Sequence, residues 1–264
     1  MSTPVLPLLG RGLMAGGAAG LAAGLFSLLL AEPLMDRAIR LEEARSHEHA
    51  DAGAAAVQHH EELFTRSTQH FGLVVTSVVF GLALGILFAI AYALVHRRNP
   101  ADSPWPRALL FSGAAFLAIS LLPALRYPAN PPGVGDSSTV SNRQALWLAA
   151  VVIGVLGMFL VWQVYVRLAG RSVPVRQVAA LCTGIAVLAV LFALPGNPDE
   201  VPVAATLLWD FRVLSIASHA LLWAVFAVVF GALGLRAFAR AAVPSAGQTP
   251  PSRGPSPSKA TGAH

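Results

Sequence analysis

The chain has 264 residues, of which 55% are hydrophobic and only 12% are charged. Soluble domains carry about 25% charged residues, so this composition excludes an ordinary soluble protein and favours a membrane protein. The formal net charge of +5 also occurs in nucleic-acid-binding proteins, but basic loops beside membrane helices explain it better, and no nucleic-acid partner is expected.

Six apolar stretches follow one another along the chain, each roughly 18 to 25 residues long, which is enough for a helix to cross a ~30 Å hydrocarbon core. We therefore predict an all-α fold: a polytopic membrane bundle of about six transmembrane helices, forming one membrane domain over residues 1–242. The predicted spans are about 12–31, 71–95, 108–125, 144–166, 178–195 and 213–235.

The two ends of the chain need separate interpretations. The first span could be a cleaved signal peptide, because Arg11 provides a positive n-region. However, its apolar stretch of about 19 residues is longer than a usual h-region, and no clean small-x-small site precedes Glu32. The last residues, 243–264, are rich in Pro, Ser and Gly and have almost no apolar side chains. We expect this tail to be disordered.

The charges between the spans predict the topology. One set of loops, with the two termini, holds 11 of the 18 basic residues and one acid, Asp102. The other set, 32–70, 126–143 and 196–212, holds the remaining 7 bases and 12 acids. Excess Lys and Arg mark the cytoplasmic face, so both termini are expected in the cytoplasm.

The arginines indicate an internal repeat. Arg107, Arg143, Arg167 and Arg171 recur 69 residues later as Arg176, Arg212, Arg236 and Arg240, and an Asn-Pro turn recurs near the same register. Spans 3–4 and 5–6 therefore resemble two copies of one helical hairpin, with spans 1–2 as a diverged third. Such copies enter the membrane in the same direction, so their outer turns should face a shared volume. The alternative is that arginines recur simply because span lengths recur.

Small residues line the first span. Gly12, Gly16, Gly20 and Gly24 are four residues apart, and Gly81 and Gly85 repeat the pattern in the second span. Glycines at this spacing form a flat helix face on which another helix backbone can pack closely. The pattern predicts a helix contact and is silent about function.

The loop 32–70 has a helix-like pattern of acids, arginines and alanines, which predicts one or two helices outside the membrane. It contains five of the eight histidines. Imidazole and carboxylate groups together suit borderline divalent ions such as cobalt, nickel and zinc. No established metal motif is present, so the alternative is a solvated polar loop.

Inside the spans, His219 is the most suggestive residue. It lies seven residues after Arg212, about 10 Å along a helix, where an ionisable side chain usually faces a cavity or a partner. The alternative is a neutral imidazole that donates to a backbone carbonyl. The proline-rich outer turns could fix oxygen donors at the membrane surface, or could be stiff connectors. The potential donors are Asn130, Asp136, Asn197, Asp199, Glu200 and, nearby, Asp210.

Several blocks of the sequence resemble the CbtA family of probable cobalt transporter subunits, over about residues 10–235. They are GLMAGGAAGLAAGLFSLLLAEPLMDRAIRLEEA, HEELFTR followed by TQHFGL, LRYPANPPGVGD, and GNPDEVP followed by LLWDFR and SxxSH. The resemblance implies a multi-pass permease subunit of the bacterial inner membrane for cobalt uptake, which works with CbtB, a small single-span partner that carries histidines. Residues in the matching blocks join the candidate set for metal contact, which is His219, Asp199, Glu200, Asp210, Asn197, Asn130, Glu32, His60 and Glu61.

The leading hypothesis is therefore a permease subunit for a divalent transition-metal ion, with Co²⁺ as cargo and no permanently bound cofactor. The sequence has no Walker-type loop and no nucleophile motif, so an enzyme is not expected. The competing hypothesis is a membrane scaffold or assembly protein whose outer loop binds partners without transporting anything.

Overall fold

A computed structural model of the chain describes residues 5–51, 65–96, 103–131, 134–197, 199, 201 and 203–242. Every regular element in these residues is helical. Six helical segments are long and apolar enough to cross a membrane, which confirms the predicted all-α membrane bundle. They are Val5–Leu41, Ser67–Val95, Pro104–Arg126, Val140–Arg167, Val173–Phe192 and Ala205–Arg240.

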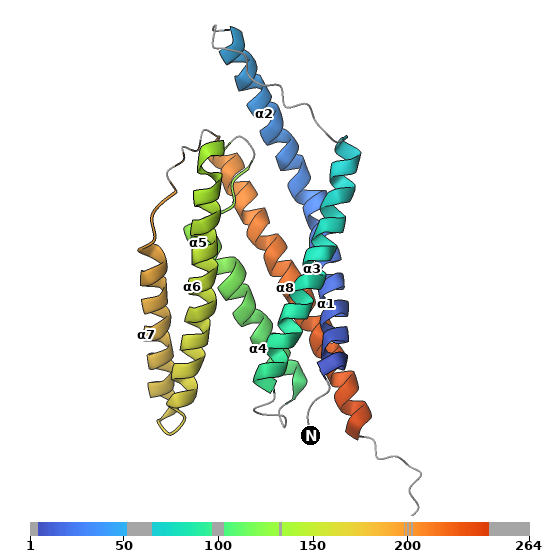
Figure 1. Cartoon of the computed structure of the whole chain (residues 1–264), viewed down its shortest axis with the longest axis vertical. Helices are drawn as coiled ribbons and strands as arrows, with labels where there is room; N and C mark the ends of the chain where they lie inside the picture. Colours follow the sequence, from blue (N-terminus) through green and yellow to red (C-terminus); the bar gives the residue numbers. More distant parts are fainter. Residues whose placement is uncertain are drawn as a thin grey trace, which may run out of the picture.

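The long helices run lengthwise through the molecule, with α4 and α8 inclined to α6 and α7 (Figure 1). The elements are α1 (Val5–Phe26), η1 (Ser27–Ala31), α2 (Glu32–Asp51), α3 (Arg66–His96), α4 (Pro104–Ala115), η2 (Phe116–Leu121), α5 (Leu122–Arg126), η3 (Ser137–Thr139), α6 (Val140–Arg167), α7 (Val173–Phe192) and α8 (Ala205–Ala242). We call the end that carries residues 127–139 and 193–204 the outer end, after the predicted topology. At this end α2 continues the first span beyond the bundle, as the sequence pattern of 32–70 predicts.

The end of the fifth span differs from the sequence prediction for an identifiable reason. The fifth span was predicted to reach residue 195, but α7 ends at Phe192. Pro195 disfavours a helical conformation in the residue before it, so the helix ends early. Residues 52–64, with the candidates His60 and Glu61, lie outside the described residues.

Prolines explain two irregular turns in the spans. Segments η1 and η2 are π-helical, and in each case a proline follows two residues after the segment ends, Pro33 and Pro123 respectively. A proline inside a helix removes one backbone hydrogen bond and its ring crowds the carbonyl four residues earlier. A π-turn absorbs that conflict locally. The first and third spans therefore each contain a π-turn before a proline near the outer end.

The glycine face of α1 packs directly on α3, as its spacing predicts. A Cβ atom added to Gly16 would lie 2.1 Å from the carbonyl oxygen of Gly81, and one added to Gly85 would lie 2.1 Å from that of Gly12. Only glycine permits this separation of the two backbones. Because apolar burial does not drive helix association in lipid, close packing of this kind is a main source of contact energy.

Aromatic side chains fill the bundle where α3, α4 and α8 meet. Phe88 lies with its ring centroid 5.0 Å from Phe111, 4.5 Å from Phe226 and 5.0 Å from Phe230. These rings are steeply inclined to that of Phe88, the favourable edge-to-face arrangement. The cluster fixes α8 against the first half of the chain.

The two predicted hairpins pack against each other, and the first is also closed on itself, because α6 packs on η2 and α5 as well as on α7. Helix α6 packs on α7, and α8 packs on α4, so the second helix of each hairpin lies on the first helix of the other. Within the described residues α7 and α8 have no extensive contact, in contrast to a simple paired hairpin. Glycines set this pattern: Gly157 of α6 receives Val187 of α7, and Gly231 of α8 receives Trp105 of α4.

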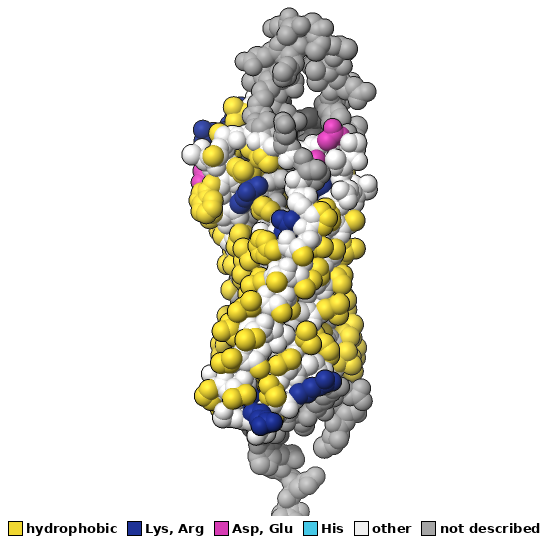
Figure 2. All heavy atoms as spheres, turned by 90° about the vertical axis from the view of Figure 1, so that its left-hand side faces the viewer, with side chains coloured by type: hydrophobic (Ala, Val, Ile, Leu, Met, Phe, Trp, Pro, Cys, Tyr) yellow, Lys and Arg dark blue, Asp and Glu magenta, His cyan; other side chains and the backbone are white. Residues whose placement is uncertain are grey.

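The side of the bundle formed by α6 and α7 is apolar over the middle of its length. Figure 2 shows hydrophobic side chains covering this part of the face, basic side chains at both ends and acidic side chains toward one end. Val178, Leu181 and Ile185 of α7 are each more than half exposed. An apolar surface of this extent would be an association site in water, whereas it matches the hydrocarbon core of a bilayer.

Single cysteines test the predicted orientation. Ser141 near the outer end and Gly170 at the opposite end are both exposed. In a Cys182→Ser background, an impermeant maleimide added to cells with a permeable outer membrane is expected to label Ser141→Cys and not Gly170→Cys. Labelling of Gly170→Cys alone would reverse the topology.

Candidate functional site

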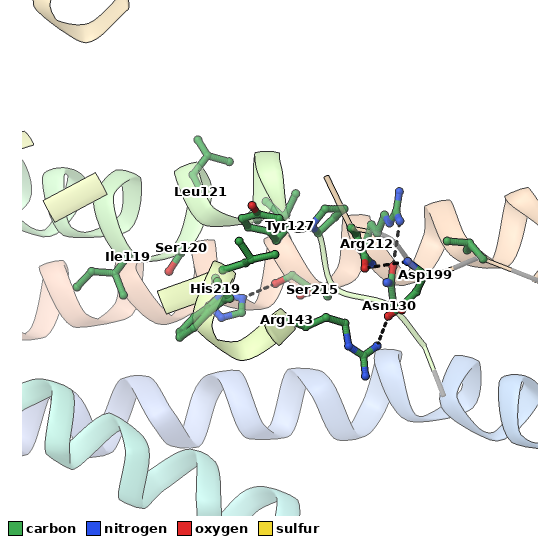
Figure 3. A pocket seen from close by; sticks show the side chains of 18 of the residues that line it. Ile119, Ser120, Leu121, Tyr127, Asn130, Arg143, Asp199, Arg212, Ser215 and His219 are labelled. Carbon is green, nitrogen blue, oxygen red and sulfur yellow. Dashed lines mark hydrogen bonds and ion pairs between the residues drawn. The ribbon is translucent and has the colours of Figure 1, made fainter. Parts of the chain in front are cut away.

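Two arginines cross-connect the outer turns. Arg143 of α6 forms an ion pair with Asp199, with Nη1 and Oδ2 3.1 Å apart, and Arg212 of α8 donates from Nη2 to Asn130 Oδ1 at 2.9 Å. Arg143 and Arg212 are 69 residues apart, and so are Asn130 and Asp199. Each arginine therefore reaches the turn of the other repeat. Figure 3 shows them approaching the Asn130 and Asp199 side chains from opposite sides.

Further hydrogen bonds fix the same turns. Thr139 Oγ1 lies 3.0 Å from both carboxylate oxygens of Asp199, and the Asp199 backbone N–H donates to Asn197 Oδ1 at 3.3 Å. Tyr127 donates its hydroxyl to the Pro195 carbonyl at 2.7 Å, and Arg126 donates to the Leu194 carbonyl. The turn after α5 and the turn after α7 are thus held together by side chains.

Asp136 caps the start of the η3 turn. Hydrogen bonds from the Ser138 side chain and from its backbone N–H hold the pKa of the Asp136 carboxyl below its ordinary value. A depressed carboxyl pKa means that the stabilisation is present above the ordinary pKa and is lost as the pH falls through the lowered value. The turn beside Arg143 therefore keeps its charged cap at neutral pH.

Below these turns lies a cavity of about 380 Å³, which we call the outer cavity. It is partly open and is lined by residues of η2, α5, α6, α8 and both outer turns. Its polar lining comes from both repeats and consists of Ser120, Tyr127, Asn130, Arg143, Trp147, Asn197, Asp199, Arg212, Ser215 and His219. The shared volume that the repeat predicts between the outer turns is present in the structure.

Four of the nine predicted metal-contact residues line the outer cavity: Asn130, Asn197, Asp199 and His219. Asp210 is exposed and does not line it, although it precedes Arg212 by only two residues. Glu32 lies elsewhere, 3.1 Å from His70 at the outer end of the first two spans. Glu200, His60 and Glu61 are outside the described residues.

His219 lines the outer cavity further along α8 from the turn residues (Figure 3), and the residue is exposed in the structure. Its Nδ1 is 2.8 Å from the Ser215 carbonyl oxygen. A carbonyl only accepts, so Nδ1 must carry the proton, and in the neutral ring Nε2 then keeps its lone pair. Metal-binding histidines commonly have this arrangement, in which a carbonyl fixes the tautomer. The hydrogen bond expected of a structural histidine is therefore compatible with a ligand role.

The π-turn η2 forms part of the cavity wall. Ser120 in this turn accepts a hydrogen bond from Trp223 Nε1 at 3.0 Å, while Ser27 in η1 lies 3.1 Å from the Ser218 hydroxyl oxygen. Both irregular turns thus hold α8 through a serine. The sequence analysis missed Ser120, Tyr127 and Trp147 as lining residues. The sequence pattern identified Arg143 and Arg212 as equivalent positions of the repeat but did not predict that they line a cavity. Their spacing of 69 residues, which Asn130 and Asp199 share, is the signal that links them to the outer turns.

The donors available in the outer cavity are few. Among the described residues, no group of three or more His, Cys, Asp and Glu side chains is arranged to hold a metal ion. The amide oxygens of Asn130 and Asn197 and the imidazole of His219 are neutral ligands. Such a set suits passing contact with a cargo ion better than permanent coordination.

Six membrane-length helices, three of which line the outer cavity, define a polytopic helical membrane protein. A family model described as "Probable cobalt transporter subunit (CbtA)" matches residues 6–234. The chain therefore belongs to the CbtA family of probable cobalt transporter subunits. No curated protein and no solved structure matches it significantly.

Proposed function

We propose that the chain is the permease subunit that moves a divalent transition-metal ion, with cobalt as the main cargo, inward across the bacterial inner membrane. It acts with a small single-span partner of the CbtB kind and performs no chemical step. The observation that carries this proposal is the outer cavity, which joins oxygen donors at the outer turns to the His219 imidazole further along α8. Membership of the CbtA family supports the choice of cargo.

The proposed path begins at the acidic outer surface, which attracts dications within a Debye length of about 8 Å. At the cavity mouth the metal ion meets the side-chain oxygens of Asn130, Asn197 and Asp199. It then reaches Nε2 of His219, which lies about two helical turns along α8 from Arg212. Neutral ligands let the ion leave again, because an anionic cage would hold a dication too tightly.

Uptake by membrane vesicles tests the proposal. Right-side-out membrane vesicles that contain the full chain and its partner are expected to accumulate more radioactive cobalt than vesicles that contain the partner alone. The scaffold hypothesis predicts the opposite: the partner or another protein transports cobalt, and removing this chain changes only assembly. Cobalt accumulation that is independent of the chain in reconstituted vesicles would contradict the proposal.

A further inference from the structure

The charge of the outer cavity does not suit a free dication. Of its lining residues, Arg143 and Arg212 are cationic and Asp199 is the one described carboxylate. Asp199 is already bonded to Arg143 and Thr139. The other described acids nearby, Asp136 and Asp210, are exposed and do not line the cavity. The described lining therefore has a net charge of +1, with its carboxylate already engaged.

Arg212 is the cation whose charge is least compensated. Its Nη2 bonds to the neutral amide oxygen of Asn130, and its Nε has no hydrogen-bond partner among the described residues. The side chain is partly buried and its Nε atom is fully buried, and a guanidinium group that is desolvated without an anion is costly. Its planar, forked set of donors matches a carboxylate, which it can hold through two parallel hydrogen bonds.

The outer cavity is also larger than one ion requires. Its volume of about 380 Å³ falls within the range of about 300 to 1,000 Å³ that is usual for small-molecule sites. Arg212 and His219 lie seven residues apart on α8, about 10 Å along the helix. The cavity thus offers an anion-binding group at one end and a neutral metal ligand at the other.

We propose that the outer cavity binds a small carboxylate anion through the Arg212 guanidinium group, and that the metal enters as a carboxylate chelate instead of a hydrated dication. The second half of this statement rests on the proposed function, whereas the first does not. In the chelate, the carboxylate offsets the charge of Arg212. The metal is presented to the amide oxygens of the turns and to His219.

Citrate without metal tests the anion site. Trisodium citrate, titrated into the purified full-length chain, is expected to bind and to change the fluorescence of Trp147, which lines the cavity. Arg212→Gln keeps a donor for Asn130 but removes the charge, and should weaken citrate binding roughly tenfold to a hundredfold. Arg212→Lys should recover part of it, because the charge returns without the planar fork.

The matched control is Arg236→Gln, which removes the same charge from an exposed position at the other end of α8. It should leave citrate binding unchanged. Equal binding by Arg212→Gln and the wild-type chain, or equal losses in Arg212→Gln and Arg236→Gln, would overturn the carboxylate site. Thermal unfolding of each purified variant shows whether a loss reflects misfolding, and in that case Arg212→Lys decides the result.

Uptake then tests the form of the cargo. Vesicles receive radioactive cobalt at one total concentration, either as the hexaaquo ion or with excess citrate. Faster uptake with citrate, lost in Arg212→Gln, supports chelate entry. Faster uptake of the hexaaquo ion, unchanged in Arg212→Gln, overturns it while the proposed function stands. Citrate binding without cobalt uptake in either form would reject the proposed function and leave the anion site in place.

Discussion

Replacing Gly16 by alanine is expected to destabilise the bundle by about 3 kcal/mol, at the upper end of the cost of overpacking. The new Cβ would lie 2.1 Å from the Gly81 carbonyl oxygen and 2.8 Å from its carbon, and both are backbone atoms. No rotamer change can relieve such a contact, so α1 and α3 must separate. Thermal unfolding of the purified full-length protein measures the effect.

Two other glycines provide the controls. Gly10 in α1 and Gly72 in α3 have no atom within 4 Å of an added Cβ. Alanine there gains helix propensity, up to about 1 kcal/mol, and meets no neighbour. Gly10→Ala and Gly72→Ala are therefore expected to be neutral or slightly stabilising. A Gly16→Ala protein as stable as these two would show that the backbones of α1 and α3 are not in contact.

His219→Ala is expected to lower cobalt uptake at saturating cobalt at least about tenfold, the scale on which loss of a metal-site residue acts. The variant removes the only imidazole lining the outer cavity among the described residues. Removal of His47 and His49 together should reduce uptake mainly when cobalt is scarce, since those residues would only collect ions at the outer surface.

Uptake must be compared at equal amounts of folded protein. The Nδ1 bond to Ser215 lies within one helix, so its loss should change the unfolding temperature little. Normal uptake by a stably expressed His219→Ala protein, at both low and high cobalt, would remove His219 from the path and leave it a packing residue.

Hydropathy and charge were sufficient to predict the six spans, because the bilayer imposes one length on each. The glycine contact between α1 and α3 was equally accessible, since four-residue spacing has one geometric meaning on a helix. The π-turns were not predicted. Their cause, Pro33 and Pro123 inside long helices, is visible in the sequence, but a proline can also end a helix, as Pro195 does beyond α7.

The site was predicted only partly, for reasons of tertiary structure. Asp210 was grouped with the turn residues by sequence proximity. On α8, however, it lies about 200° around the helix from Arg212 and away from the cavity. The contacts of Arg143 with Asp199 and of Arg212 with Asn130 depend on which helices pack together, and no local sequence pattern determines that pairing.

The pairing of α6 with α7 and of α8 with α4 has a consequence for ancestry. A lone hairpin of this type would lack the neighbour that Gly157 or Gly231 receives, and a second copy in the same orientation could supply it. The arrangement is the one that a parallel homodimer of hairpins would have, with Arg143 and Arg212 as the two reciprocal contacts across its interface. Fusion of the two copies into one chain would preserve that interface, while Asn130 and Asp199 could then diverge into a neutral and a charged partner.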